Sequence, residues 1–332
     1  MSAITSWAQR LNDLGRRSCP CFFLMDFEQE FPRVWELAER EWDMPRFSFP
    51  RHPETGTPPI GLRAPKLLAD HIDAKTFERA FSVVQAGLRR GDSFLTNLTF
   101  PVPVQLTTAL EEIYWQSDAK YRILWEGHFV CFSPETFITI DKEGYIESRP
   151  MKGTALDTPA ARNALLNSQK EIAEHATIVD LIRNDLSQVA RKVRVTDYRY
   201  FHKIATSRRG LVQTSSKIGG QLPEDWKSGL GDILTKLLPA GSVSGAPKPA
   251  TLDIIRRAEG QKRGYYCGIG GYFDGETVDT CVLIRFIEKT DSGDYLFRSG
   301  GGITARSDWE EEYKELKAKV RIPLSGVTFT LH

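Results

Sequence analysis

Apolar residues recur along the chain at two spacings, one typical of β-strands and the other typical of helices. Short apolar or alternating runs predict strands at residues 21–27, 93–100, 121–125, 129–133, 193–202, 211–218, 265–273, 278–288 and 295–299. Helical spacing predicts helices at residues 1–17, 32–42, 74–90, 158–190, 224–238, 249–257 and 309–320, the one at 158–190 with at most one interruption. Because the strands precede and separate a few helices instead of alternating with them, the pattern favours an α+β fold of layered sheets.

Turn-forming residues mark several boundaries. The helix at 74–90 is followed by Gly91, in the position where glycine commonly ends a helix. The segment FITIDKEGYIESRP predicts two strands joined by a turn at 141–144, and the proline-rich segment 47–65 predicts a loop. No internal repeat or low-complexity linker divides the chain, so we expect residues 1–90 and 91–325 to form one continuous structural unit.

Composition and charge exclude several classes of protein. Hydrophobic residues make up 41% and charged residues 26%, and the formal net charge is +1, so no global field indicates nucleic acid or membrane as a partner. No apolar run approaches the roughly 18 residues that a membrane span needs, and the N-terminus lacks a signal-peptide core, so we expect a cytoplasmic protein. The five cysteines have no disulfide-framework or zinc-site spacing, and Cys131, Cys267 and Cys281 are expected in the core.

Lys152 stands in the segment RPMKGT, directly after the two strands joined by a turn. A lysine between a strand end and a glycine is held by the backbone, and Gly153 allows a ligand to approach closely. Taken alone, the segment is explained equally well by a solvated lysine at a strand end, because lysine is usually exposed. Motifs farther along the chain favour a functional role: two E-x-x-E pairs, an S-G-A-P-K loop and a run of three glycines.

The two E-x-x-E pairs are Glu171 with Glu174 and Glu312 with Glu315. Residues three apart share a face of a helix, and both pairs are expected on a side that also carries buried residues. Carboxylates that face inward repel one another unless a cation lies between them, and their oxygens suit a hard ion such as Mg²⁺. The alternative is a solvated helix face, which is the better explanation for an isolated pair.

Two further motifs suggest an anion site. Arg285 ends the apolar run DTCVLIR, where a buried arginine costs free energy unless it meets an anion. Gly300–Gly302 are expected to expose consecutive N–H groups that can hold a carboxylate, with a strand-to-turn transition as the alternative. The loop PAGSVSGAPK does not predict a nucleotide-binding P-loop, because Pro247 and not glycine precedes Lys248.

Together these segments make the chain similar to the chorismate-utilising enzymes, and within them to aminodeoxychorismate synthase component I. The similarity runs from about residue 92 to 320 and rests on these segments in one order: GDSFLTNLTF, FSPE, RPMKGT, EIAEHATIVDLIRNDLSQV, PAGSVSGAPKPATLDII, RGYYCGIGGYFDGETVDTCVLIR and RSGGGITARSDWEEEYKELKAKV. The resemblance implies two large, roughly orthogonal β-sheets packed as a sandwich, with helices outside and a cleft between the halves. Residues 1–90 would be a shortened N-terminal portion and residues 91–325 the chorismate-binding catalytic domain.

The resemblance also implies which residues form the site. Glu174 and Glu315 would bind Mg²⁺ directly against the ring carboxylate of chorismate, and Glu171 and Glu312 would act through water. The implied substrate-binding residues are Arg285, Tyr266, Gly300, Gly301 and Gly302 at the enolpyruvyl carboxylate, Lys319 at the ring carboxylate, and Ser242, Gly153, Thr154 and Gln213 as further contacts.

Exchange of the C4 hydroxyl of chorismate for an amino group needs a general acid and gains from a nucleophile, because hydroxide is a poor leaving group. In relatives of the aminodeoxychorismate type, the lysine of P-x-K-G-T adds to the ring and the glutamate of S-P-E transfers protons. Those positions are Lys152 and Glu135 here, whereas anthranilate synthases have alanine at the lysine position. Burial is expected to lower the pKa of Lys152 and so favour its neutral, nucleophilic form.

Gln213 stands where many relatives have the histidine of H-x-x-S-x-V-x-G-x-L, which is linked to aromatisation in the anthranilate branch. Glutamine cannot shuttle a proton at neutral pH, which suits an enzyme that stops at aminodeoxychorismate. His175 is expected to be at most a neighbour of Glu174. The L-L-E-S motif of the tryptophan site is not found, so feedback control by tryptophan is not expected.

We therefore expect Mg²⁺-dependent amination of chorismate to 4-amino-4-deoxychorismate, for p-aminobenzoate and folate synthesis. No glutaminase motif is visible, so a separate glutamine amidotransferase subunit is expected to supply the ammonia. The alternatives are anthranilate synthase component I, an isochorismate or salicylate synthase, and a chorismate-binding regulatory subunit without turnover.

Overall fold

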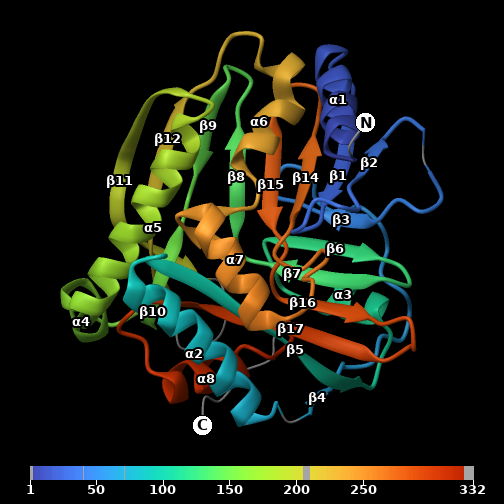
Figure 1. The fold of residues 1–332 in the computed structure, drawn as a ribbon. Helices are drawn as coiled ribbons and strands as arrows, with labels where there is room; N and C mark the ends of the chain where they lie inside the picture. Colours follow the sequence, from blue (N-terminus) through green and yellow to red (C-terminus); the bar gives the residue numbers. More distant parts are fainter. Residues whose placement is uncertain (1–2, 40, 71, 205–209, 325–332) are drawn as a thin grey trace.

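The computed structural model describes residues 3–39, 41–70, 72–204 and 210–324. In this part of the chain the strands form two antiparallel sheets, as the sequence predicted (Figure 1). The first sheet has the strand order β10 (Met151–Leu156), β12 (Leu211–Gln221), β9 (Tyr145–Ser148), β8 (Thr136–Ile140), β15 (Val278–Val282), β14 (Ile269–Phe273), β1 (Cys21–Met25) and β2 (Arg33–Glu36), with β11 (Arg191–Ile204) paired to β12. The second has the order β13 (Gly245–Ala246), β5 (Leu95–Leu106), β17 (Tyr295–Ile303), β16 (Phe286–Lys289), β7 (Phe129–Ser133), β6 (Tyr121–Trp125) and β3 (Arg46–Ser48), with β4 (Leu67–Ala69) paired to β5.

Alternating side chains of the second sheet bury both of its faces. Ile123 and Cys131 point into a core shared with the first sheet, whereas Leu124 and Val130 point into a second core under the helices. This follows from the two-residue period of a strand, which sends successive side chains to opposite faces. The three cysteines predicted for the core, Cys131, Cys267 and Cys281, are all buried.

Eight α-helices and two short 3-10 turns cover the sheets in the described part of the chain (Figure 1). They are α1 (Ala3–Arg16), α2 (Ala74–Arg90), α3 (Leu110–Gln116), α4 (Pro159–Asn167), α5 (Gln169–Ser187), η1 (Trp226–Gly229), α6 (Leu230–Leu237), η2 (Gly241–Val243), α7 (Lys248–Glu259) and α8 (Trp309–Ala318). Helix α2 has the predicted bounds, with Gly91 at φ 80° as its C-cap. The helical segment predicted at 158–190 with at most one interruption is broken at Ser168, whose side chain caps α5 by accepting a hydrogen bond from the Glu171 N–H.

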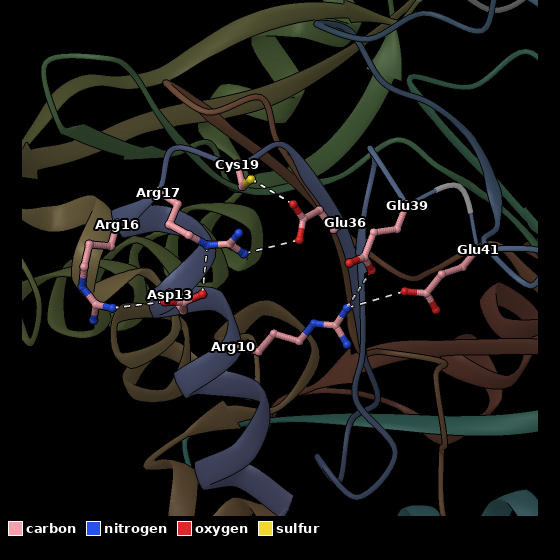
Figure 2. Close-up of polar contacts among 8 residues, drawn as sticks. All are labelled: Arg10, Asp13, Arg16, Arg17, Cys19, Glu36, Glu39 and Glu41. Carbon is pink, nitrogen blue, oxygen red and sulfur yellow. Dashed lines mark hydrogen bonds and ion pairs between the residues drawn. The ribbon is translucent and has the colours of Figure 1, made fainter.

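Helix α1 packs against α6 and is also joined to the β1–β2 hairpin by polar contacts (Figure 2). Arg17 contacts both Asp13 and Glu36, and the Cys19 thiol donates a hydrogen bond to Glu36 at 3.0 Å. Exposed ion pairs of this kind contribute little to stability, so the buried apolar face of α1, which includes Leu11, holds the helix in place.

Two of the predicted elements are wrong. The helix predicted at 32–42 is replaced at Arg33–Glu36 by β2, which pairs with β1 and in which Val34 and Trp35 are buried. The run 278–288 is not one strand: it divides into β15 and β16, which belong to different sheets. Arg285 stands just before β16 with φ 56°, a left-handed conformation within the break between the two strands.

None of the helices in the described ranges has both the length and the apolar run needed to cross a membrane.

Candidate active site

Every residue predicted for the site lines one cavity of about 500 Å³. The cavity is bounded by β10 and β12 of the first sheet, by β5 and β17 of the second, and by helices α5 and α8. The predicted residues found there are Glu135, Lys152, Gly153, Thr154, Glu171, Glu174, Gln213, Ser242, Tyr266, Arg285, Gly300, Gly301, Gly302, Glu312, Glu315 and Lys319. The chain thus brings together segments that are separated by more than 100 residues in sequence.

A bulge in β10 presents Lys152 to this cavity. Lys152 pairs with Thr214 and Thr154 pairs with Gln213, so Gly153 is an extra residue between two registers, at φ 76°. The Thr214 hydroxyl donates a hydrogen bond to the Lys152 carbonyl and fixes the backbone at the bulge. A bulge re-aims the neighbouring side chain, and here the Lys152 ammonium lies 2.8 Å from the Glu174 carboxylate.

We expect Gly153→Ala to impair the site more than the fold. An added Cβ would lie 2.6 Å from Glu171 Oε2 and 2.8 Å from Leu165 Cδ1, in a conformation that only glycine adopts without strain. The matched control is Gly127→Ala, because Gly127 has nearly the same φ, 75°, and open space around it. Thermal unfolding should show a loss of about 1 kcal/mol for the control, and catalytic activity should fall only in Gly153→Ala. Wild-type turnover in that variant would show that the bulge is not part of the site.

The four glutamates face the cavity from α5 and α8, but they differ in burial. Glu174 and Glu312 are buried, whereas the Glu315 side chain is 58% exposed and forms an ion pair with Lys319 at 2.7 Å.

Burial raises the pKa of Glu171, and the nearby Glu174 carboxylate raises it further. Burial likewise raises the pKa of Glu312, although the Ser307 hydroxyl, which donates a hydrogen bond to it at 2.8 Å, acts against this. Glu171 and Glu312 therefore favour the protonated form or a nearby cation. The pKa of Glu315 is instead lowered, because the Lys319 ammonium outweighs the effect of its desolvation.

The predicted decrease in the pKa of Lys152 is wrong. Desolvation is the largest single influence and lowers the pKa, but Glu174, Glu315 and Glu171 together raise it above the ordinary value. Lys152 is therefore an ammonium in the free site. Its neutral form becomes accessible only when these carboxylates are engaged elsewhere, as they would be by a metal ion.

The donor set fits a hard divalent cation without forming a ready-made metal site. Among the described residues, no three carboxylate, histidine or cysteine side chains lie close enough together to hold an ion. Glu171 Oε2, however, is buried and has no hydrogen-bond partner among these residues. An orphaned carboxylate oxygen next to Glu174 is the kind of donor that Mg²⁺ takes, so the residues present fit this ion.

Glu135 lies between β7 and β8, at another part of the cavity wall. The Ser242 hydroxyl donates a hydrogen bond to Glu135 Oε1 at 2.5 Å. Burial raises the pKa of Glu135, although the Ser242 hydrogen bond and the Arg285 charge act against this increase. A carboxyl group with a raised pKa retains its proton at higher pH than an ordinary glutamate and can donate it as an acid.

The cavity also has a cationic part suited to a carboxylate. The Arg285 side chain is partly buried, and this desolvation lowers its pKa. Within the described part of the chain no carboxylate forms an ion pair with it. The Lys319 ammonium donates a hydrogen bond to the Gly300 carbonyl at 2.9 Å, and burial lowers its pKa as well. A partly buried arginine without an ion-pair partner in the described ranges, close to a lysine in the same cavity, is a suitable donor for a carboxylate ligand.

The glycine run differs from the prediction. Gly300, Gly301 and Gly302 continue β17 and pair with Thr99, Leu98 and Asn97 of β5. Successive N–H groups of a strand point to opposite sides, so the run cannot offer three consecutive donors to one carboxylate. A Cβ on Gly301 would lie 3.3 Å from the Lys319 ammonium, so the glycine leaves room for that side chain.

Gln213 pairs with Thr154 and lines the cavity wall. His175 does not line the cavity. It is fully buried behind Glu174, its Nε2 lies 2.7 Å from the Ser216 hydroxyl, and burial lowers its pKa to about 4. His175 is therefore neutral and unsuited to proton transfer with a bound ligand.

Some cavity residues were missed by the sequence reasoning. Asn97 is a polar residue within a predicted strand, and Lys170 directly precedes Glu171. Both could have been found from the sequence, because they are polar residues of β5 and α5, two elements that were already expected at the site. Cys267, at φ 64°, carries no such signal, because only the backbone path brings it to the cavity.

Comparison with known proteins agrees with this geometry. Residues 27–325 match the family described as chorismate binding enzyme. A Haemophilus influenzae protein named "Uncharacterized PabA-like protein" is 43% identical over 98% of both chains. Aminodeoxychorismate synthase component 1 of Salmonella typhimurium is 34% identical over 72% of this chain and 55% of its own length.

Solved structures show the same fold. Anthranilate synthase component I of Streptococcus pneumoniae superposes with a TM-score of 0.65 and 25% identity, covering 88% of this chain and 69% of its own. The menaquinone-specific isochorismate synthase MenF of Escherichia coli superposes with a TM-score of 0.69 and 15% identity, covering 95% and 80% of the two chains. With the family match covering nearly the whole chain and the cavity built from the motifs that suggested it, this protein belongs to the chorismate-binding enzyme family.

Proposed function

We propose that the protein aminates chorismate at C4 to give 4-amino-4-deoxychorismate. The observation that carries the proposal is the position of Lys152 in the cavity wall, at the place in the motif where anthranilate synthases have alanine. Glu135, with its raised pKa, lines the same cavity and supplies the acid that the leaving hydroxyl needs. The 34% identity to aminodeoxychorismate synthase component 1 of Salmonella typhimurium supports the same assignment.

The reaction would proceed in two displacement steps. The Lys152 amine adds to the ring of chorismate while the C4 hydroxyl leaves as water with a proton from Glu135. Ammonia then adds at C4 while the bond to Lys152 breaks, and Glu135 recovers a proton from the incoming nitrogen. Chorismate and ammonia are thus converted into aminodeoxychorismate and water, and a covalent intermediate divides one difficult step into two.

The charged residues would hold the substrate during these steps. Arg285 and Lys319 are placed to bind carboxylates, and Glu171, Glu174, Glu312 and Glu315 would hold Mg²⁺. The ion would neutralise the crowded glutamates and bind a substrate carboxylate. Engagement of Glu174 by the ion would also remove the main contact that keeps Lys152 protonated.

Ammonia would come from a separate glutamine amidotransferase subunit. The sequence has no recognisable glutaminase motif, and the curated relatives include proteins named as component 1 of a synthase. Free ammonium should replace the subunit in a test of activity, because the amination site itself is proposed to lie within this chain.

The test is an assay of the product. Purified protein with chorismate, MgCl₂ and ammonium salt should produce aminodeoxychorismate, detected as p-aminobenzoate after addition of a lyase. Omission of ammonium or addition of EDTA should stop the reaction. Anthranilate or isochorismate as the only product would refute the proposal, and chorismate binding without turnover would indicate a regulatory subunit.

A further inference from the structure

A buried ion pair between Asp185 and Lys248 lies behind the wall of the cavity. The Lys248 ammonium is 2.9 Å from Asp185 Oδ2, and the two side chains are 16% and 11% exposed. Neither residue lines the cavity, and the proposed chemistry uses neither. A buried ion pair needs a reason, because desolvation of the two charges offsets much of their attraction.

The pair joins the helices that surround the loop carrying Ser242. Asp185 belongs to α5 and Lys248 begins α7, and the Lys248 ammonium also donates a hydrogen bond to the Leu237 carbonyl, at the end of α6, at 2.8 Å. The loop runs between these ends, through residues 238–247. Its backbone packs directly on the carboxylate: a Cβ on Gly241 would lie 3.0 Å from Asp185 Oδ2.

The same loop holds Glu135 through the Ser242 hydrogen bond. Glu135, Asp185, Gly241 and Ser242 also border a small cavity of about 20 Å³. This space is large enough for only about one water molecule. Asp185 of the ion pair therefore lies close to Glu135, the proposed acid.

The other half of the loop is held independently. A buried guanidinium, that of Arg263, donates a hydrogen bond to the Val243 carbonyl at 2.7 Å, and the Asn97 N–H donates one to the Ser244 carbonyl at 2.9 Å. Contacts from Arg263 and Asn97 therefore fix residues after Ser242. On the other side, the loop lies against the ion pair at Gly241.

We propose that the Asp185–Lys248 pair is a positioning device for Glu135. It fixes Gly241 and Ser242, and through the Ser242 hydroxyl it orients the Glu135 carboxyl toward the substrate. The inference rests on the proposed role of Glu135 as the acid. Loss of one charge leaves the other buried and unpaired, which displaces the loop, and small displacements of a reacting group are costly to turnover.

The test is a double-mutant cycle of Asp185→Asn and Ser242→Ala, measured as chorismate consumption. Asp185→Asn should lower kcat about 10- to 100-fold with little change in KM, because the substrate contacts remain. In the Ser242→Ala background, Asp185→Asn should lower kcat little further, because the hydrogen bond that links the loop to Glu135 is already missing. A merely structural role would give the same loss in both backgrounds, and that result would overturn the proposal.

The matched control is Asp253→Asn, which breaks an exposed ion pair with Arg257 on α7 and should leave kcat unchanged. If Asp185→Asn does not fold, Asp185→Glu serves in its place, because it keeps the charge and changes only the reach of the carboxylate. It should lose turnover, and wild-type kcat would overturn the proposal. Chorismate consumption is independent of the product, so a product other than aminodeoxychorismate would refute the proposed function and leave this test valid.

Discussion

Lys152→Ala is expected to lower C4 amination of chorismate by about 10³-fold or more, because the variant lacks the amine that forms the proposed covalent intermediate. Chorismate binding should be nearly intact, since Arg285, Lys319 and the four glutamates remain. The variant also creates the P-x-A-G-T of anthranilate synthases, so traces of amination at C2 are expected. Product analysis by mass spectrometry, together with a binding titration, measures both outcomes.

Two controls distinguish a role of Lys152 as nucleophile from a role as a positive charge. Lys152→Arg keeps a cation near Glu174 but cannot become a neutral amine, so it should be as inactive as the alanine variant. Wild-type protein quenched during turnover should carry an adduct on the peptide that contains Lys152. Because carboxylates raise the pKa of Lys152, the wild-type rate should rise with pH as the ammonium loses its proton. Full C4 amination by Lys152→Ala would show that the lysine is a spectator.

Glu174→Gln and Glu315→Gln are expected to abolish activity at ordinary Mg²⁺ concentration, a loss on the order of 10²-fold or more, because each removes an anionic ligand of the proposed metal site. Glu171→Gln should have a smaller effect if its contact passes through water. Since Glu174 also contacts Lys152, turnover alone does not isolate the metal, and Mn²⁺ binding without chorismate should be titrated as well.

Glu311→Gln is the matched control for this series, because Glu311 lies on the exposed side of α8 beside Glu312. It should keep both metal affinity and turnover. Equal and small effects of the three substitutions at Glu171, Glu174 and Glu315 would refute the metal assignment, and so would unchanged Mn²⁺ affinity in Glu174→Gln and Glu315→Gln.

Much of the fold could be predicted because local patterns and tertiary structure agree. The strands at 121–125 and 129–133 and the helix at 74–90 have the bounds that their apolar spacing and end signals indicate. The helix predicted at 32–42 failed because pairing between strands outweighed the local helical preference of the sequence. Residues 33–36 have acceptable helical spacing, but β1 offers them backbone hydrogen-bond partners, and the strand buries Trp35. A helix at this place would lose both contributions.

The members of the site could be predicted better than their interactions. A spacing of three residues placed Glu171 beside Glu174 and Glu312 beside Glu315, because helix geometry depends only on local sequence. The pairing of Lys152 with Glu174 could not be predicted, because it depends on a bulge that one extra residue creates between two strands. The direction of the Lys152 pKa shift was wrong for the same reason: desolvation can be inferred from sequence, but the distances to three carboxylates cannot.

The pairing of β5 with β17 has a consequence for how the protein is made. This pairing sets Leu98 beside Gly301, more than 200 residues apart, and α8 with Glu312 and Glu315 follows β17 in the chain. Contacts of such high sequence separation form slowly, because the entropy of closing a long loop opposes them. A ribosome-bound chain that has not yet emerged past residue 300 therefore lacks the strand and helix that complete the cavity around Lys152 and Glu174. Substrate can bind only after the last elements dock, so chorismate should stabilise the completed chain and leave N-terminal nascent chains unprotected from proteolysis.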